Sequence, residues 1–389
     1  MDFELKPEQA QLRDMLQRFI RKDYGFEARR RIVASPEGFS REVWRTFAEL
    51  GLLGLGIPEE HGGMGGDAID ALVVMEALGS GLVVEPYLST VVLGAGLVRA
   101  GGSEAQKAAV LPAVAGGEML LALAHGEPGG RYEVDQVAAT ARKRGTGYVL
   151  NGTKSVVMHG DSADQLVVSA LTGSRISLFL INADSPGVKR RSYATRDGRR
   201  AADIAFEEVA VGREALIGAE GEALPLLERA IDGAIAALCA EAVGCMDALI
   251  AQTLEYLKTR KQFGVAIGTF QVLKHRMADM FIAAAQARSM ACLAAIRAGD
   301  ADGQARRHAI SAAKALVGRS ARLVGQQAVQ LHGGMGVTEE LAVSHYFKRL
   351  TAINTLFGDA DHHLARFSDQ MLEGEPAAIA PRAVAQAAA

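Results

Sequence analysis

The stretch GYVLNGTKSVVMHG, residues 147–160, interrupts a chain that otherwise has the pattern of helices. It contains β-branched residues in short apolar runs bounded by turn residues, which is typical of strands. Within it, Asn151-Gly152 is the strongest kind of short signal for a β-hairpin. The stretches ISLFLINAD at 176–184 and AADIAFEEVAV at 201–211 have the same character. Residues 120–225 are therefore predicted to form a small β domain.

Helical patterns flank this β domain on both sides. Near the N-terminus, PEQAQLRDMLQRFI at 7–20 places apolar residues at i, i+3, i+4, i+7 and i+8, behind a proline suited to a first helical position. A glycine-rich segment, IPEEHGGMGGD at 57–67, interrupts the helical pattern. From residue 226 the helical period returns, and AIAALCAEAVGCM at 234–246 is apolar on most faces. Such a helix is expected to be buried on all sides.

This order predicts an α+β protein with three domains. We expect an N-terminal α-helical domain at 1–119, a small β-barrel or sandwich domain at 120–225, and a C-terminal four-helix bundle at 226–374. The remaining tail, residues 375–389, carries nothing that would fix it to a core and is expected to be disordered.

Composition argues against several classes of protein. The chain has 389 residues and a net charge of −3, which gives no basic surface for nucleic acid. Its first residues lack the basic and apolar regions of a secretory signal. The most apolar uncharged run, 86–98, is shorter than the roughly 20 residues of a membrane helix. Three cysteines without CxxC spacing are expected to be buried in a reducing compartment. We therefore predict a soluble cytoplasmic protein that binds neither nucleic acid nor membrane.

Two C-terminal segments carry a family resemblance. YLKTRKQFGVAIGTFQVLKHRMADM at 256–280 is similar to the R-x-x-F-G…I…Q…A-D-M run of the acyl-CoA dehydrogenase family, and QLHGGMGVTEELAVSHYFKRL at 330–350 matches its Q-x-x-G-G-x-G. PEEHGGMGG near the start and LNGTK in the middle extend the resemblance over nearly the whole chain. The resemblance implies an FAD enzyme of lipid metabolism that oxidises acyl-CoA thioesters to trans-2-enoyl-CoA. It also implies a tetramer that passes electrons to an electron-transfer flavoprotein.

The resemblance also assigns cofactor contacts. The family's arginine, matched by Arg260, contacts the FAD pyrophosphate of a neighbouring subunit, and a guanidinium suits a diphosphate. Phe263 would pack nearby. The residues implied at the adenosine end are Gln271, Gln330, Gly333 and Gly334. In the middle domain, HGEPGGRYEVD at 125–135 stands where the family has T-E-P-G-x-G-S-D, so Glu127 and Gly129 are retained as candidate cofactor contacts.

Other positions depart from the family. Val156 stands where a Trp packs on the flavin, and Met158 where a Thr donates to it. The catalytic base of most members is a Glu, and here Gly358 occupies that position. In the isovaleryl and long-chain branches the Glu lies on the first long C-terminal helix, where this chain has Ala234. Neither known base position holds a carboxylate.

Carboxylates near these positions are candidate substitutes. Asp359 and Asp361 follow the loop position, and Glu241 lies two helical turns beyond Ala234, roughly 10.5 Å along the axis. Glu241 and Asp359 are the candidate catalytic residues. The alternative for Glu241 is a buried carboxylate paired with a distant Arg or Lys.

The segment TLFGDADHHLAR at 355–366 raises the possibility of a metal site, because it holds two carboxylates and two histidines. Adjacent histidines on a helix point about 100° apart, which disfavours binding one ion. We predict instead that this segment begins a helix capped by Asp359 or Asp361, with no metal. One of the two histidines could face a cofactor phosphate.

The retained residues are those that would serve a neighbour's FAD, and the lost ones would hold the chain's own flavin and supply the base. This division favours one subunit of a heterotetramer, and FGDADHHLARF and KSVVMHGD resemble the small-subunit type of bacterial pimeloyl-CoA and steroid side-chain dehydrogenases. Two alternatives remain: a self-sufficient homomeric dehydrogenase with a relocated base, or a non-catalytic acyl-CoA-binding or scaffold protein.

Overall fold

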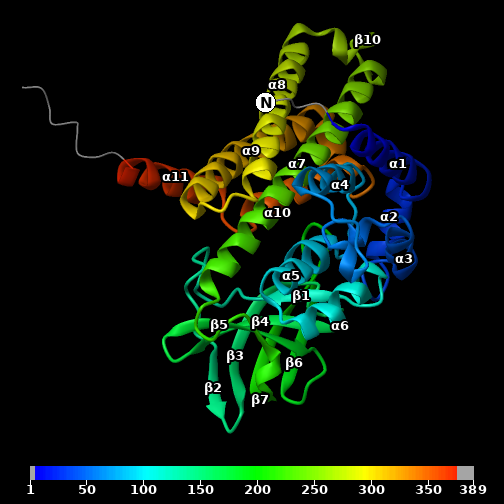
Figure 1. The fold of residues 1–389 in the computed structure, drawn as a ribbon. Helices are drawn as coiled ribbons and strands as arrows, with labels where there is room; N and C mark the ends of the chain where they lie inside the picture. The colour runs from blue at the N-terminus through cyan, green and yellow to red at the C-terminus, as the bar shows by residue number, and fades with distance from the viewer. Residues whose placement is uncertain (1–4, 375–389) are drawn as a thin grey trace, which may run out of the picture.

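The computed structural model describes residues 5–374. In Figure 1 an N-terminal group of helices and a long C-terminal helical domain lie above a β domain. The chain therefore has the predicted α+β architecture of helices, then strands, then helices. The N-terminal helices are α1 (Pro7–Asp23), α2 (Phe26–Val33), α3 (Arg41–Glu49), α4 (Ala68–Ser80), the π-helix η3 (Leu88–Ala95), α5 (Gly96–Gly101) and α6 (Glu104–Ala115). Leu16 and Ile20 of α1 are buried, as their spacing predicts.

The middle domain is one mixed sheet. Its strands are β1 (Leu121–Ala124), β2 (Thr140–Arg144), β3 (Gly147–Met158), β4 (Gln165–Thr172), β5 (Arg175–Asn182), β6 (Val188–Ala194), β7 (Arg200–Val211) and β8 (Leu216–Ile217). The strand order is β6-β7-β3-β2-β4-β5-β8, and β1 pairs parallel with β4. Side chains on one face of this sheet, including Leu166, Phe179 and Phe206, form the domain's own apolar core.

The hairpin predicted at Asn151-Gly152 is wrong, because these residues lie inside β3. The actual β2–β3 turn is Gly145-Thr146, since Arg144 pairs with Gly147. The register of β3 with β7 shifts between Leu150 and Gly152, so the Asn-Gly pair marks a bulge. Gly152 has φ +142°, and a Cβ there would lie 2.6 Å from the Cβ of Ala139. The bulge requires glycine for both reasons.

The C-terminal domain is built on three long helices, α7 (Leu224–Thr259), α8 (Gln271–Arg297) and α9 (Gly303–His332). The short strands β9 (Lys261–Gln262) and β10 (Val265–Ala266) form a hairpin between α7 and α8 at the end far from the β domain (Figure 1). The helices α10 (Ala342–Thr355) and α11 (Ala360–Gly374) complete the domain. The tail predicted to be disordered, 375–389, lies outside the described residues.

Helices α7 and α8 are long and apolar enough to cross a membrane by length and composition alone. The most membrane-like segments of the chain are therefore these two helices and not residues 86–98. In α7, 78% of the most apolar window is buried inside the protein, as expected of the central helix of a helical domain. In α8 the corresponding share is only 39%, which leaves an apolar face uncovered in the single chain.

Close packing of α4 against α7 depends on glycine. A Cβ at Gly244 of α7 would clash with the backbone oxygen of Glu76 in α4, and one at Gly79 would clash with the backbone oxygen of Glu241. The thiol of Cys245 donates to the Gly79 oxygen at 3.2 Å, which shows how near the two backbones lie.

We expect Gly244→Ala to destabilise the chain by about 1–3 kcal/mol, because the two helices must separate to accommodate the methyl group. Gly233→Ala is the matched control on the same helix, since nothing lies within 4 Å of an added Cβ there. It should be neutral or gain up to about 1 kcal/mol from helix propensity. Denaturant unfolding measures both, and equal effects of the two substitutions would contradict this account.

Candidate functional site

A groove near the β9–β10 hairpin brings together most of the residues expected at the adenosine end of FAD. It has a volume of about 620 Å³, and its lining includes Arg260, Gln330, Gly333 and Gly334. The ring of Tyr256 stacks on His332 along the same wall, with ring centroids 4.3 Å apart. Gln271 is the first residue of α8, just beyond the hairpin, and is exposed. Phe263, at the hairpin tip, is 91% exposed.

The groove has features that suit a dinucleotide phosphate. Arg260 follows α7 as its C-cap and is exposed, and it forms no ion pair with a carboxylate within residues 5–374. Gly333, with φ +61°, ends α9, and nothing lies within 4 Å of a Cβ added at Gly333 or Gly334. The backbone there is open to close approach by a ligand. A free guanidinium beside open backbone is a suitable arrangement for a diphosphate.

Glu127 in the middle domain is engaged by the protein itself. Its carboxylate accepts hydrogen bonds from the backbone N–H groups of Ala138 at 2.8 Å and Ala139 at 3.0 Å, and from Lys154 Nζ at 2.6 Å. Burial alone would raise the pKa of Glu127, but these hydrogen bonds hold it below its usual value. With both oxygens occupied, Glu127 fits a structural role better than the predicted cofactor contact.

Lys154 of β3 lies at the centre of this arrangement, and the sequence pattern of residues 147–160 gives no sign of its role. Its side chain is fully buried and also donates to Ser169 Oγ at 2.9 Å and to the His125 backbone oxygen at 3.2 Å. It thereby fixes the start of the 125–135 loop, and Glu127 connects that start to Ala138 and Ala139 just beyond the loop's end. Gly129, the other retained residue of that loop, is exposed with φ +91°. It lies in the β domain, whereas the groove lies at the opposite end of the molecule (Figure 1).

The α10–α11 connection confirms the predicted helix cap. Asp359 Oδ1 accepts from the backbone N–H of His362 at 2.8 Å, and Asp361 follows in the exposed first turn. The other oxygen of Asp359 faces Tyr132, whose hydroxyl lies 3.5 Å away. The Tyr132 ring also contacts the His362 ring, with centroids 5.1 Å apart. The middle-domain loop therefore closes directly onto this connection, and both oxygens of Asp359 have partners.

A buried histidine, His363, packs against Gly358, the position where most members of the family carry the catalytic Glu. His363 Nε2 lies 2.9 Å from the Phe357 oxygen and Nδ1 lies 3.3 Å from Ser311 Oγ. Burial lowers the pKa of His363 to about 3. A Cβ at Gly358 would lie 2.6 Å from His363 Nε2. Being buried, His363 is not the histidine that could face a cofactor phosphate.

Lys314 fixes the same connection from α9. Its Nζ donates to the backbone oxygens of Leu356, at 2.9 Å, and of Ile353. Burial lowers the pKa of Lys314 to about 8. The loop is thus held in one shape by buried groups, and that shape has no room for a Glu side chain at Gly358.

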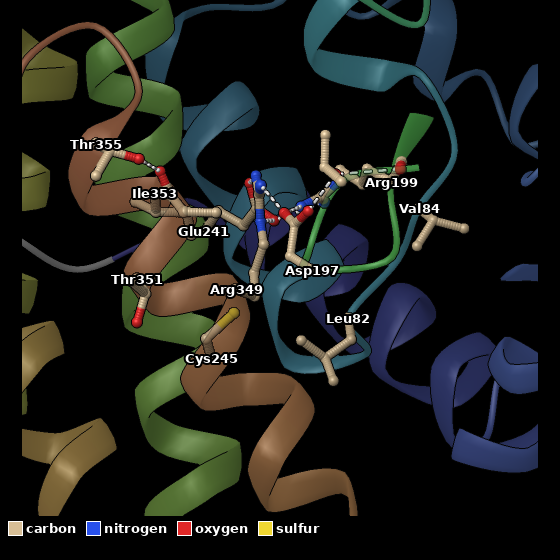
Figure 2. Close-up of polar contacts among 12 residues, drawn as sticks. Leu82, Val84, Asp197, Arg199, Glu241, Cys245, Arg349, Thr351, Ile353 and Thr355 are labelled. Atoms are coloured by element: carbon tan, nitrogen blue, oxygen red, sulfur yellow. Dashed lines mark hydrogen bonds and ion pairs between the residues drawn. The ribbon is translucent and has the colours of Figure 1, made fainter. Parts of the chain in front are cut away.

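Glu241 lies in a buried ion network between the three domains (Figure 2). Arg349 of α10 donates to Glu241 through Nε at 2.7 Å and Nη2 at 2.6 Å, and to Asp197 through Nη1 at 2.8 Å. Arg199 Nη2 donates to Glu241 at 2.7 Å and to the Val83 oxygen at 2.6 Å. From α2, Arg29 Nη2 donates to the Asp197 backbone oxygen at 2.8 Å. All five residues are at most 8% exposed.

This geometry does not support Glu241 as a catalytic base. Burial would raise its pKa, but the charges of Arg199 and Arg349 overcome burial and lower it. A carboxylate that is ionised, doubly paired and walled in is a poor proton acceptor. The alternative kept open for Glu241, a buried partner of distant arginines, is the arrangement observed. Arg199 and Arg349 lie 42 and 108 residues from Glu241 in the chain, so no local sequence pattern predicts that they pair with it.

Comparison with known proteins agrees with this architecture. Acyl-CoA dehydrogenase N-terminal, middle and C-terminal domain profiles match residues 6–118, 122–209 and 225–372. The chain is 32% identical to acyl-CoA dehydrogenase IpdE2 of Mycobacterium tuberculosis, covering 94% of this chain and 98% of that protein. It is 31% identical to the probable acyl-CoA dehydrogenase YngJ of Bacillus subtilis, covering 90% and 93%. The ChsE4–ChsE5 complex from M. tuberculosis contains a similar chain, with a TM-score of 0.87, 26% identity, and coverage of 97% and 100%.

The chain belongs to the acyl-CoA dehydrogenase family of oxidoreductases. The family implies FAD as cofactor and dehydrogenation of an acyl-CoA as the general reaction. The groove fits the adenosine and diphosphate part of FAD. The positions that the family resemblance assigns to the chain's own flavin fit less well. Val156 stands there in place of an aromatic residue and is 53% exposed, and Tyr132 contacts the α10–α11 connection.

Proposed function

We propose that this chain is one subunit of a heterotetrameric acyl-CoA dehydrogenase. It supplies the adenosine half of a composite FAD site, and a homologous partner chain supplies the flavin half and the catalytic carboxylate. The observation that carries this proposal is the contrast within one chain: an open groove containing Arg260, Gly333 and Gly334, and a base position closed by His363.

An uncovered apolar surface beside the groove supports a subunit contact. It comprises the hairpin tip and exposed positions of α8, with large side chains between 44% and 91% exposed: Phe263, Val265, Val272, Phe281 and Ile282. An apolar surface of this kind is a feature of interaction sites. Because it borders the groove, a subunit docked on it would place its own cofactor beside Arg260. The similarity to a chain of the ChsE4–ChsE5 complex is consistent with a heteromeric assembly.

Each part of the proposed site has a chemical task. When bound, FAD supplies the hydride acceptor for oxidation of the acyl Cα–Cβ bond to a trans double bond. Arg260 neutralises the diphosphate and fixes its position, while Gly333 and Gly334 allow the adenosine end to approach the backbone. The α-proton goes to a carboxylate of the partner chain, because Glu241 and Asp359 are both engaged within this chain. We further propose electron-transfer flavoprotein as the acceptor and the cytoplasm as the location.

Flavin content tests the proposal. The purified chain alone should be colourless, and after co-purification with a homologous subunit that retains the Glu base it should carry one FAD per pair of chains. Arg260→Ala in this chain should remove most of that flavin, because the diphosphate loses its bidentate partner. Arg45→Ala, at an exposed position of α3, is the matched control and should retain it.

Two outcomes would contradict the proposal. A homotetramer with one FAD per chain and full turnover of acyl-CoA would show that the chain is self-sufficient. Protein that stays colourless with every homologous partner would point to a non-catalytic binding or scaffold role.

A further inference from the structure

A cavity separate from the adenosine groove lies between the N-terminal and C-terminal helices. It has a volume of about 350 Å³ and is bounded by the start of α4, by η3 and α5, by the first half of α7 and by the end of α8. Most of its wall is apolar, with Leu72, Val91 and Leu226 among the lining residues. It shares no lining residue with the adenosine groove or with the α10–α11 connection. A volume above roughly 300 Å³ is typical of a small-molecule site.

Small residues of α7 face this cavity. Gly233, Ala236 and Ala237 all line it, and nothing lies within 4 Å of a Cβ added at Gly233. Gly96 and Gly299, from two other elements of the wall, are equally free. This differs from Gly244 on the same helix, where an added Cβ would clash with α4. Small side chains around residue 233 therefore leave space open, while those near residue 244 allow close packing.

Two arginines stand at the edge of the cavity. Arg229 Nη2 donates to the Gly299 oxygen at 2.9 Å, and Arg99 Nη1 donates to the Gly56 oxygen. Both arginines are exposed, and among residues 5–374 their hydrogen bonds go to backbone oxygens and not to a carboxylate. Burial and the charge of Arg229 lower the pKa of Arg99, so the two guanidiniums repel each other. An anion between them would relieve this repulsion.

Asp67, the acidic residue in the same wall, does not neutralise the arginines. Its Oδ1 accepts from the backbone N–H groups of Ile69 at 2.8 Å and Asp70 at 3.1 Å, as the cap of α4. Its other oxygen lies 3.4 Å from Lys6 Nζ. The mouth of the cavity therefore keeps two positive charges above an apolar interior.

We propose that this cavity binds a free aliphatic carboxylate, with its head between Arg99 and Arg229 and its chain along η3 and α7. Guanidinium groups pair with carboxylates through charge-assisted hydrogen bonds. At about 30 Å³ for each atom, as for water in the liquid, the cavity of about 350 Å³ holds roughly twelve heavy atoms. A saturated chain of about that length fits, whereas a complete acyl-CoA does not. The π-helical form of η3 is rare and frequent at functional sites.

Calorimetric titration of the full chain with decanoate, alone and with its partner subunit, tests the proposal. One decanoate should bind per chain whether or not flavin is present, so the result is independent of the composite-site proposal. Arg99→Gln and Arg229→Gln should each weaken binding about tenfold, the loss expected for one charged hydrogen bond. Arg45→Gln, a matched surface change, should leave the affinity unchanged.

Filling the cavity is the second arm of the test. Gly233→Leu should abolish decanoate binding without unfolding the chain, because its side chain enters open space. 1-Decanol, which has the same chain and no charge, should bind at least tenfold more weakly than decanoate. Equal binding of decanol and decanoate, unchanged binding to Gly233→Leu, or no binding of decanoate at all would overturn the proposal. Tighter binding of decyl phosphate than of decanoate would overturn the assignment of a carboxylate.

Discussion

Replacing Arg349 with methionine should destabilise the chain by about 3–5 kcal/mol, the range measured when one partner of a buried ion pair is removed. The guanidinium makes three hydrogen bonds, two to Glu241 and one to Asp197, and it is 2% exposed. Methionine keeps an unbranched side chain, although a shorter one, and leaves both carboxylates short of a partner. Urea unfolding measures the change. Arg297→Met is the control, because Arg297 pairs with Asp300 at the surface and should contribute less than about 1 kcal/mol.

The stability of the wild-type chain and that of Arg349→Met should depend differently on pH. In the folded wild type the pKa values of Asp197 and Glu241 lie below their usual range, despite burial, because of the charges of Arg349 and Arg199. A lowered carboxyl pKa contributes stability above the unfolded values near 4, and this stability is lost as the pH falls. The difference in unfolding free energy between wild type and Arg349→Met should therefore shrink between pH 7 and about pH 3. A constant difference would show that the network does not act through charge.

Gly358→Glu should fail to create a dehydrogenase, although it restores the family's residue at the base position. Gly358 has φ +107°, a conformation that costs other residues about 1–3 kcal/mol, and an added Cβ meets His363 at 2.6 Å. His363 cannot yield easily, because its two ring nitrogens contact Phe357 and Ser311. We expect a loss of about 2–5 kcal/mol in unfolding free energy, and acyl-CoA turnover no higher than that of the wild-type chain.

Gly264→Glu provides the matched control for this prediction. Gly264 also has a positive φ, +81°, but nothing lies within 4 Å of an added Cβ. It should therefore show the cost of backbone strain without the clash, and lose clearly less stability than Gly358→Glu. If Gly358→Glu proved as stable as Gly264→Glu and gained turnover, the loop would be intact apart from one missing side chain.

The sequence predicts the fold well because its signals are local and repeated. The helical period of residues 7–20 and the long apolar helix around Cys239 are each visible within one element. The Asn-Gly pair predicts a hairpin turn but forms a bulge, because both structures favour a glycine with unusual φ. Only the pairing of β3 with β7 distinguishes the two. Strand pairing, and not the Asn-Gly pair itself, therefore determines whether these residues form a turn or a bulge.

The candidate site was predictable only where it repeats a motif. Arg260, Gln330, Gly333 and Gly334 come from two motifs, and the fold brings them into one groove. Glu241 and Glu127 could not be assigned from sequence, because their partners are remote in the chain or separated by a strand. Burial and pairing, which decide whether a carboxylate can act as a base, are properties of the folded molecule. The cavity beside Gly233 was likewise invisible, since small residues in a helix indicate close packing and open space equally.

The ion network of Figure 2 has a consequence for motion in the assembled enzyme. Its ion pairs join Asp197 and Arg199 of the second domain to Glu241 and Arg349 of the third. Arg29 of the first domain, which Figure 2 does not label, donates to the backbone oxygen of Asp197. Hinge bending between any two domains would expose or separate buried charges, at a cost of several kcal/mol. This chain should therefore behave as a rigid frame. Opening and closing around substrate during the catalytic cycle would then be left to the partner subunit.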